Sequence, residues 1–264
     1  MQGGSGVGIG NFQEVGPLDT DLKPRNSTWL KMADLLFVDN PVGTGYSFVE
    51  DEKLFVKTDE EAAADLTTLL ISLYSKDVEL QKSPLYIVAE SYGGKYAVTL
   101  ALSALKAIDA GKLKMKLGGV ALGDSWISPE DFVVSWGPLL KDLSRIDNPG
   151  LQKSNSVVQK IKQQISAGQY KEATDSWSEL ESVISDSSNS VDFYNFLLDS
   201  GMDSASSSSS SSDQTRGEIA MKRYSTYLNL NSLRSTPGGD NGGDLSSLMN
   251  GVIKKKLKLP ASVR

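Results

Sequence analysis

Three short apolar runs in the first half of the chain are typical of buried β-strands. They cover residues 33–39, 85–89 and 118–122, and Pro or Gly punctuates the chain beside each run. Runs without polar alternation are typical of strands that are buried on both faces of a parallel sheet. We therefore predict a strand over each of these three ranges. Residues 1–28, by contrast, are punctuated by glycine and proline and predict a loop.

Two segments between these runs have apolar residues at helical spacing. The first begins with a capping box, in which Thr58 can accept from a first-turn amide and Glu61 can reach back. The second begins at Gly93-Gly94 and ends at Gly111. The apolar positions are Leu66, Leu69, Leu70 and Leu73 in the first segment and Ala97, Leu100, Ala101 and Leu105 in the second. Strands and helices that alternate in this way predict a parallel α/β sheet.

The pattern changes after Trp126, where helical spacing continues without strand signals. Two stripes are present, one at Val158, Ile161 and Ile165, the other at Tyr170, Ala173, Trp177, Leu180 and Ile184. We predict a core domain over residues 1–125 and a helical region over residues 126–264. Residues 204–212 are serine except for Ala205, which favours a flexible loop over the alternative of a phosphorylated segment.

The composition excludes several kinds of chemistry. The 264 residues include no histidine and no cysteine, and 33 acidic residues against 27 basic ones give a net charge of −6. Without these two residue types the chain offers no Ser-His or Cys-His mechanism, no His or thiolate metal site and no disulfide. We therefore expect no metal and no cofactor.

Charge and hydropathy also restrict the partners. An acidic chain lacks the basic face that nucleic acids require, so we expect no nucleic-acid binding. The lysines at 254, 255, 256 and 258 favour a solvated tail over a polyanion site. No apolar stretch approaches the roughly 18 residues of a membrane span, so we expect no membrane anchor.

The segment Ala89-Glu90-Ser91-Tyr92-Gly93-Gly94 has the pattern of a nucleophile elbow. It lies between a predicted strand and a predicted helix, and it has small residues two positions before and after Ser91. The alternative is a tight turn whose serine caps the helix. The pair Gly3-Gly4 could present backbone amides to an oxyanion together with the Tyr92 amide, although two glycines by themselves indicate only a turn.

Four motifs together resemble the serine carboxypeptidases, in particular the retinoid-inducible or plant serine carboxypeptidase-like branch. The resemblance implies an α/β-hydrolase fold interrupted by a helical insertion, or cap, and cleavage of C-terminal residues from peptides through an acyl-enzyme. The motifs are Gln2-Gly3-Gly4, residues 11–17 (NFQEVGP), residues 36–47 (LFVDNPVGTGYS) and residues 90–96 (ESYGGKY).

The same resemblance implies a role for each matching residue. Ser91 is the implied nucleophile, and the amides of Gly4 and Tyr92 form the implied oxyanion hole. The implied ligands of the substrate carboxylate are Gln2, Glu14 and Glu90. Two glutamates can hold a carboxylate only if protons are shared among them, and like charges raise one another's pKa, so such a site works best in acid. The alternative for both glutamates is surface solvation.

The chain also departs from the family pattern. Gly4 is followed at once by Ser5-Gly6 where the family has Gly-Gly-Pro-Gly-x-Ser, which predicts a re-aimed Gly4 amide. No residue matches the triad Asp or His. We therefore interpret the chain as a truncated member with an incomplete α/β-hydrolase fold, inactive by itself and poorly stable. The alternatives are an acyltransferase of the same family and a noncatalytic binder of peptide C-terminal carboxylates.

Location follows from the resemblance as well. It implies a secreted, vacuolar or lysosomal protein, for which Asn26-Ser27-Thr28 is a glycosylation sequon at Asn26. Residues 1–6 do not resemble a secretory leader, so we expect a cytoplasmic location if the start is genuine.

Overall fold

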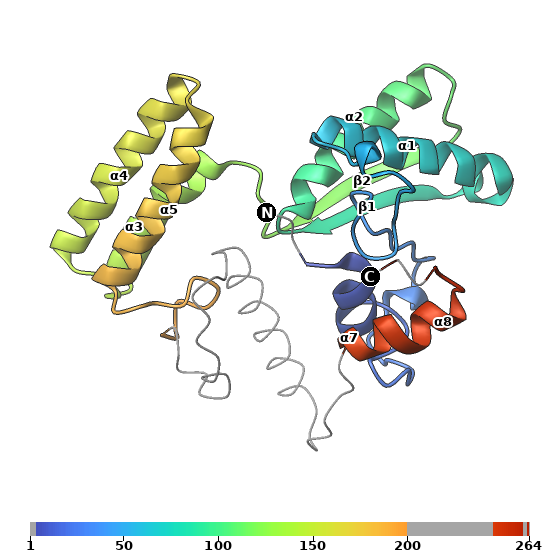
Figure 1. The fold of residues 1–264 in the computed structure, drawn as a ribbon, viewed down its shortest axis with the longest axis horizontal. Coiled ribbons are helices and arrows are strands. Elements are labelled where there is room, and N and C mark those ends of the chain that lie inside the picture. The colour runs from blue at the N-terminus through green and yellow to red at the C-terminus, as the bar shows by residue number, and fades with distance from the viewer. Residues whose placement is uncertain (1–3, 200–244, 261–262, 264) are drawn as a thin grey trace. The chain divides into compact units, whose positions relative to one another are not determined.

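The computed structural model describes residues 4–199, 245–260 and 263, and these residues form two compact units (Figure 1). The first unit contains residues 4–127 together with the described residues from 245 onward, and the second contains residues 128–199. Residues 245–260, which we assigned to the helical region, thus belong to the first unit. Their link is direct, because the Tyr46 hydroxyl donates to the Met249 carbonyl oxygen at 2.6 Å. The serine-rich range 204–212 lies outside the described residues.

The first unit contains a parallel two-stranded sheet with helices before, between and after its strands. Strand β1 (Pro84–Glu90) pairs with β2 (Lys116–Gly123), which confirms two of the three predicted strands. The other elements are η1 (Gly6–Glu14), η2 (Trp29–Lys31), η3 (Glu52–Leu54), α1 (Asp59–Lys76), η4 (Val78–Lys82), α2 (Gly93–Asp109), α7 (Leu245–Leu248), η5 (Met249–Ile253) and α8 (Lys254–Lys256).

The prediction of a strand over residues 33–39 is wrong for the part of the chain that the structure describes. Residues 34–40 have no regular secondary structure and form no ladder with another described strand. An apolar run becomes a strand only when a neighbouring strand accepts its backbone hydrogen bonds, and β1 and β2 pair with each other instead.

The prediction of a loop over residues 1–28 is also wrong in part. Residues 6–14 form η1, a π-helix, although they include three glycines. The Ser5 hydroxyl caps this helix by accepting from the Gly8 amide at 2.9 Å, and Phe12 buries its ring. These contacts offset the low helix propensity of glycine.

Helices α1 and α2 cover one face of the sheet (Figure 1). The predicted capping box of α1 is confirmed: Thr58 Oγ1 accepts from the Glu61 amide at 3.2 Å, and Glu61 Oε2 accepts from the Thr58 amide at 3.3 Å. The core beneath these helices consists of Leu70, Tyr74, Ala104, Leu113 and Met115, with Leu85 and Leu117 packed against it from the strands.

The opposite face of the sheet is open among the described residues. Tyr86 and Val88 of β1 are 63% and 53% exposed. The Tyr86 ring lies across β2, where a Cβ on Gly118 would come within 2.7 Å of the ring carbon Cζ. Both faces of a parallel sheet are normally covered, so this face presents apolar surface to water.

The second unit is a bundle of α3 (Pro129–Asp142), α4 (Asn148–Ser166) and α5 (Tyr170–Ser187). The first predicted stripe is confirmed in α4, and the second is confirmed in α5 except at Tyr170, which is 69% exposed; Val158, Ile161, Leu180 and Ile184 lie in one buried cluster. The pattern did not predict α3, which contributes Val133 and Leu140 to that cluster. None of the described helices is long and apolar enough to cross a bilayer.

The open sheet face predicts self-association of the chain. We expect the purified chain to scatter light as oligomers or aggregates, and the double variant Tyr86→Thr, Val88→Thr to move toward the 28.4 kDa monomer, because threonine keeps strand propensity while removing apolar area.

The matched control is Leu139→Thr with Leu197→Thr, which removes two exposed apolar side chains from the other unit and should leave the scattering mass unchanged. A wild-type chain that is monomeric with one sharp melting transition would contradict this prediction.

Candidate functional site

Ser91 occupies a strained turn between β1 and α2. Its φ angle is +56°, in the left-handed region that residues with a side chain rarely adopt. Backbone hydrogen bonds hold it there: the Ser91 amide donates to the Gly123 carbonyl at 3.0 Å, and the Ser91 carbonyl accepts from the Trp126 amide at 3.0 Å. Strain of this kind costs roughly 1–3 kcal/mol and is concentrated at functional sites.

Small residues allow the strand and helix to meet around this turn. A Cβ on Gly94 would lie 2.2 Å from Ser125 Oγ, so only glycine fits there. A Cβ on Gly93 would lie 3.5 Å from Ala89 Cβ, an ordinary contact. The close approach that demands a small residue is therefore at position 94, one residue after the position that the elbow pattern names.

Ser91 does not cap α2. The N-cap residue of this helix is Tyr92, and no side-chain hydrogen bond caps it. The Tyr92 ring packs edge-on against Tyr96 at 5.2 Å between centroids, and Lys95 Nζ lies 5.6 Å from its centre. Lys95 in turn pairs with Asp59 of α1 at 2.7 Å, so α1, α2 and the turn are joined at one place.

Glu14 lies at the end of η1 and is partly buried. Burial raises the pKa of Glu14 above its usual range, the charge of Glu90 raises it further, and Arg25 opposes both. The charge of Glu90 is thus one of those that act on the Glu14 carboxyl. Glu90 is the last residue of β1 and precedes Ser91 directly. Its side chain is exposed.

The other predicted site residues are placed only in part. Gln2 lies outside the described residues, whereas Gly4 is described and exposed. After Gly4 the chain turns at once into η1, because Ser5 caps that helix and also donates to Asp39 Oδ1 at 3.4 Å. Asn26 is exposed on the loop before η2, where a glycan would meet no buried surface.

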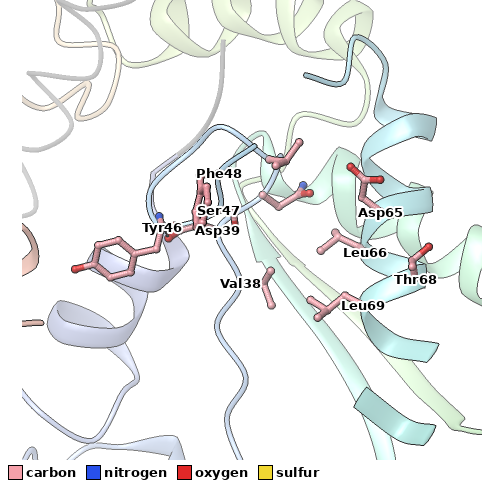
Figure 2. A pocket seen from close by; sticks show the side chains of 11 residues that line it. Val38, Asp39, Tyr46, Ser47, Phe48, Asp65, Leu66, Thr68 and Leu69 are labelled. Carbon is pink, nitrogen blue, oxygen red and sulfur yellow. Dashed lines mark hydrogen bonds between the residues drawn. The ribbon is translucent and has the colours of Figure 1, made fainter. Parts of the chain in front are cut away.

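A pocket of about 450 Å³ lies between α1 and residues 38–48 (Figure 2). Its wall includes Leu66 and Leu69 of α1 and, from the facing segment, Val38 and Asp39. Burial raises the pKa of Asp39, although the Tyr46 amide donates to its carboxylate at 2.9 Å. Among the described residues, none of those predicted for the site lines this pocket.

The described residues contain no group of three or more Asp or Glu that could hold a metal ion. Sequence reasoning missed Arg25, whose guanidinium donates to the Glu14 carbonyl at 2.8 Å. No motif marks this arginine. The one sequence signal is the pair Pro17 and Pro24, which flank a turn. This turn brings Arg25 back toward η1 and Glu14.

A serine held in a strained turn between a parallel strand and a helix is typical of the α/β-hydrolases, and the described part of the chain has an incomplete version of that fold. Residues 2–238 match the serine carboxypeptidase family, Peptidase S10, and the chain belongs to this family. The resemblance of its motifs is thereby confirmed.

Individual relatives agree with this assignment. The chain is 64% identical over 265 residues to serine carboxypeptidase-like 51 of Arabidopsis thaliana, covering 98% of this chain and 57% of the relative. It is 44% identical to the mouse retinoid-inducible serine carboxypeptidase over 257 residues, covering 97% of this chain and 54% of the relative. The chain thus spans about half the length of the curated relatives that it matches.

A solved structure has a similar fold. The prohormone-processing carboxypeptidase Kex1(delta)p of Saccharomyces cerevisiae aligns with a TM-score of 0.67 at 20% identity, covering 98% of this chain and 54% of the yeast chain. At this identity the likeness concerns the fold alone.

The tight approach at Gly94 predicts different outcomes for two neighbouring substitutions. Gly94→Ala should destabilise the chain by about 1–3 kcal/mol, because its Cβ would overlap Ser125. Gly93→Ala, the matched control, should change stability by no more than about 0.5 kcal/mol. Urea unfolding followed by circular dichroism measures both, and equal midpoints for the two variants would refute the packing argument.

The raised pKa of Glu14 predicts that stability depends on pH. The pKa of Glu14 is higher in the folded chain than in the unfolded chain, where it is near 4.5. Such a carboxyl contributes stability that is fully present below the unfolded pKa. This stability is lost as pH rises through the folded pKa. Glu14→Gln mimics the protonated acid, so it should raise the melting temperature at pH 7 and give no gain near pH 4. The control Glu50→Gln alters an exposed loop carboxyl. A gain at position 14 that does not vary with pH would contradict burial as the cause.

Proposed function

We propose that Ser91, Glu14 and Glu90 form the peptide-binding half of a serine carboxypeptidase site. The observation that carries this proposal is the partly buried Glu14, whose raised pKa reflects burial and the nearby charge of Glu90. A protonated Glu14 can donate a hydrogen bond to the free carboxylate of a peptide, which an ionised pair of glutamates would repel. A C-terminal peptide held there would have its last peptide bond next to Ser91.

The family reaction gives each of these groups a role. The Ser91 hydroxyl attacks the carbonyl carbon of the last peptide bond and loses its proton to a base. The C–N bond then breaks, the terminal amino acid leaves with a proton, and water releases the acyl group from Ser91. The amides of Gly4 and Tyr92 are our candidates for stabilising the oxyanion, and Gln2 for holding the carboxylate beside the glutamates.

The family reaction needs a base, which is a histidine in such a triad. None of these 264 residues is a histidine. Loss of the serine or histidine of such a triad costs about 10⁶ in turnover. We therefore propose that this chain binds peptide C-termini and does not turn them over by itself. Acyl transfer, the alternative reaction of this family, needs the same base and gains no support from any described contact.

Localisation and modification follow from family membership. We propose a secreted, vacuolar or lysosomal protein with an N-linked glycan on Asn26, whose exposed side chain supports modification. Neither the relatives nor the fold supports the cytoplasmic alternative. An acidic compartment would suit a site whose glutamates must share a proton.

Binding of a free carboxylate is the direct test. Isothermal titration at pH 5 with N-acetyl-Phe-Leu should give measurable heat, whereas the C-terminal amide of the same dipeptide should give much less, because the neutral amide accepts a weaker hydrogen bond from a protonated glutamate than the charged carboxylate does. Glu14→Ala should abolish the heat, and Ser91→Ala, which leaves the carboxylate ligands in place, should retain it. Equal heats for acid and amide would rule out carboxylate recognition.

Reactivity of Ser91 is tested separately. A fluorophosphonate probe should leave Ser91 unlabelled in the wild-type chain, because no base activates the hydroxyl. Labelling of the wild type that disappears in Ser91→Ala would show that another group serves as the base, and the inactive part of the proposal would then be wrong.

A further inference from the structure

The guanidinium of Arg25 lies at the C-terminal end of η1, the helix that carries Glu14. A π-helix leaves its last carbonyl groups without partners inside the helix. In η1 the Gly10 carbonyl accepts from the Val15 amide at 2.8 Å. The Phe12 and Glu14 carbonyls instead accept from the two terminal nitrogens of Arg25, at 3.3 and 2.8 Å. Arg25 therefore caps η1 at the end where the backbone dipole also favours a positive charge.

The loop that carries Arg25 is closed by its own hydrogen bonds. The Arg25 amide donates to the Pro17 carbonyl at 2.9 Å. Within the turn, Asp19 Oδ1 accepts from the amides of Asp21 and Lys23, both at 2.9 Å. The Asp19 amide also donates back to the Lys23 carbonyl at 3.0 Å. Arg25 is thus brought to η1 by a loop that has hydrogen bonds of its own.

The contact with η1 requires the planar, forked shape of the Arg25 guanidinium. Its two terminal nitrogens contact two carbonyls at once, while its Nε is buried and has no hydrogen-bond partner among the described residues. A lysine ammonium on its flexible stem is a point charge and cannot reproduce a planar fork. Arg25 therefore supplies both a charge and a fixed geometry, and the two can be separated by substitution.

We propose that Arg25 is a positioning residue for the carboxylate-binding site: by holding the last turn of η1, it sets where the Glu14 carboxyl meets the C-terminus of a peptide. This inference rests on the proposed function. It differs from that function because Arg25 bonds to backbone carbonyls and is assigned no contact with the substrate.

The charge of Arg25 has a second effect on the same carboxyl. Among the described residues, the charged groups that act on Glu14 are Glu90, which raises its pKa, and Arg25, which lowers it. Removing the Arg25 charge should therefore let the pKa of Glu14 rise further. A purely structural arginine elsewhere on the surface would not move this titration.

The first experiment needs no ligand. Carboxyl-carbon NMR of the full chain follows the titration of Glu14 in the wild type, Arg25→Gln, Arg25→Lys and Lys23→Gln. Arg25→Gln should raise the midpoint, and Arg25→Lys, which keeps the charge, should leave it near the wild-type value. Lys23→Gln is the matched control, because it removes a cation of the same loop that bonds to Asp21 and not to η1.

The second experiment measures binding of N-acetyl-Phe-Leu by calorimetry at pH 5. Arg25→Gln should weaken binding about tenfold or more, because two charge-assisted hydrogen bonds that fix Glu14 are lost. Arg25→Lys should recover only part of the affinity, since it restores the charge without the fork. Lys23→Gln should bind like the wild type.

Each outcome decides the proposal. If Arg25→Gln matches Lys23→Gln in midpoint and affinity, Arg25 does not position Glu14. If Arg25→Gln does not fold, the lysine variant decides: reduced affinity at an unchanged midpoint supports the fork, and wild-type affinity overturns it. If the wild type itself binds no dipeptide, the proposed function fails, while the titration still shows whether Arg25 acts on Glu14.

Discussion

The first unit depends on one backbone turn, in which Ser91 is bonded from both sides. Its amide donates to Gly123 at the end of β2, and its carbonyl accepts from Trp126 in the segment that follows β2. The end of the paired strands, the start of α2 and the place of Glu90 therefore meet at these few bonds. These bonds offset the roughly 1–3 kcal/mol that a positive φ angle costs a serine.

The other half of the candidate site is held in a different way. Glu14 lies on η1, a glycine-containing π-helix that is capped at one end by Ser5 and at the other by Arg25. Its position is set by hydrogen bonds of a loop, whereas the position of Ser91 is set by the sheet. The two halves of the site can therefore be disturbed independently, since a change in the loop touches Glu14 and leaves the strained turn intact.

Elements whose apolar pattern matches their own burial could be predicted from the sequence, and β1, α1 and α4 are such elements. Residues 33–39 have an equally apolar pattern but no partner strand among the described residues, and a pattern cannot reveal whether a neighbour exists. The π-helix η1 has no hydrophobic period of its own, so its caps and the burial of Phe12 explain it. Glu14 was found through resemblance, and Arg25 was missed because its partner is a backbone carbonyl, which no side-chain pattern reveals.

The positive φ angle of Ser91 affects which substitutions the chain would favour in evolution. Glycine adopts this conformation without strain, so replacing Ser91 by glycine would relax the turn. Selection for stability alone would therefore favour glycine over serine at this position. At this turn the chain therefore carries a backbone strain that a single change from serine to glycine would remove.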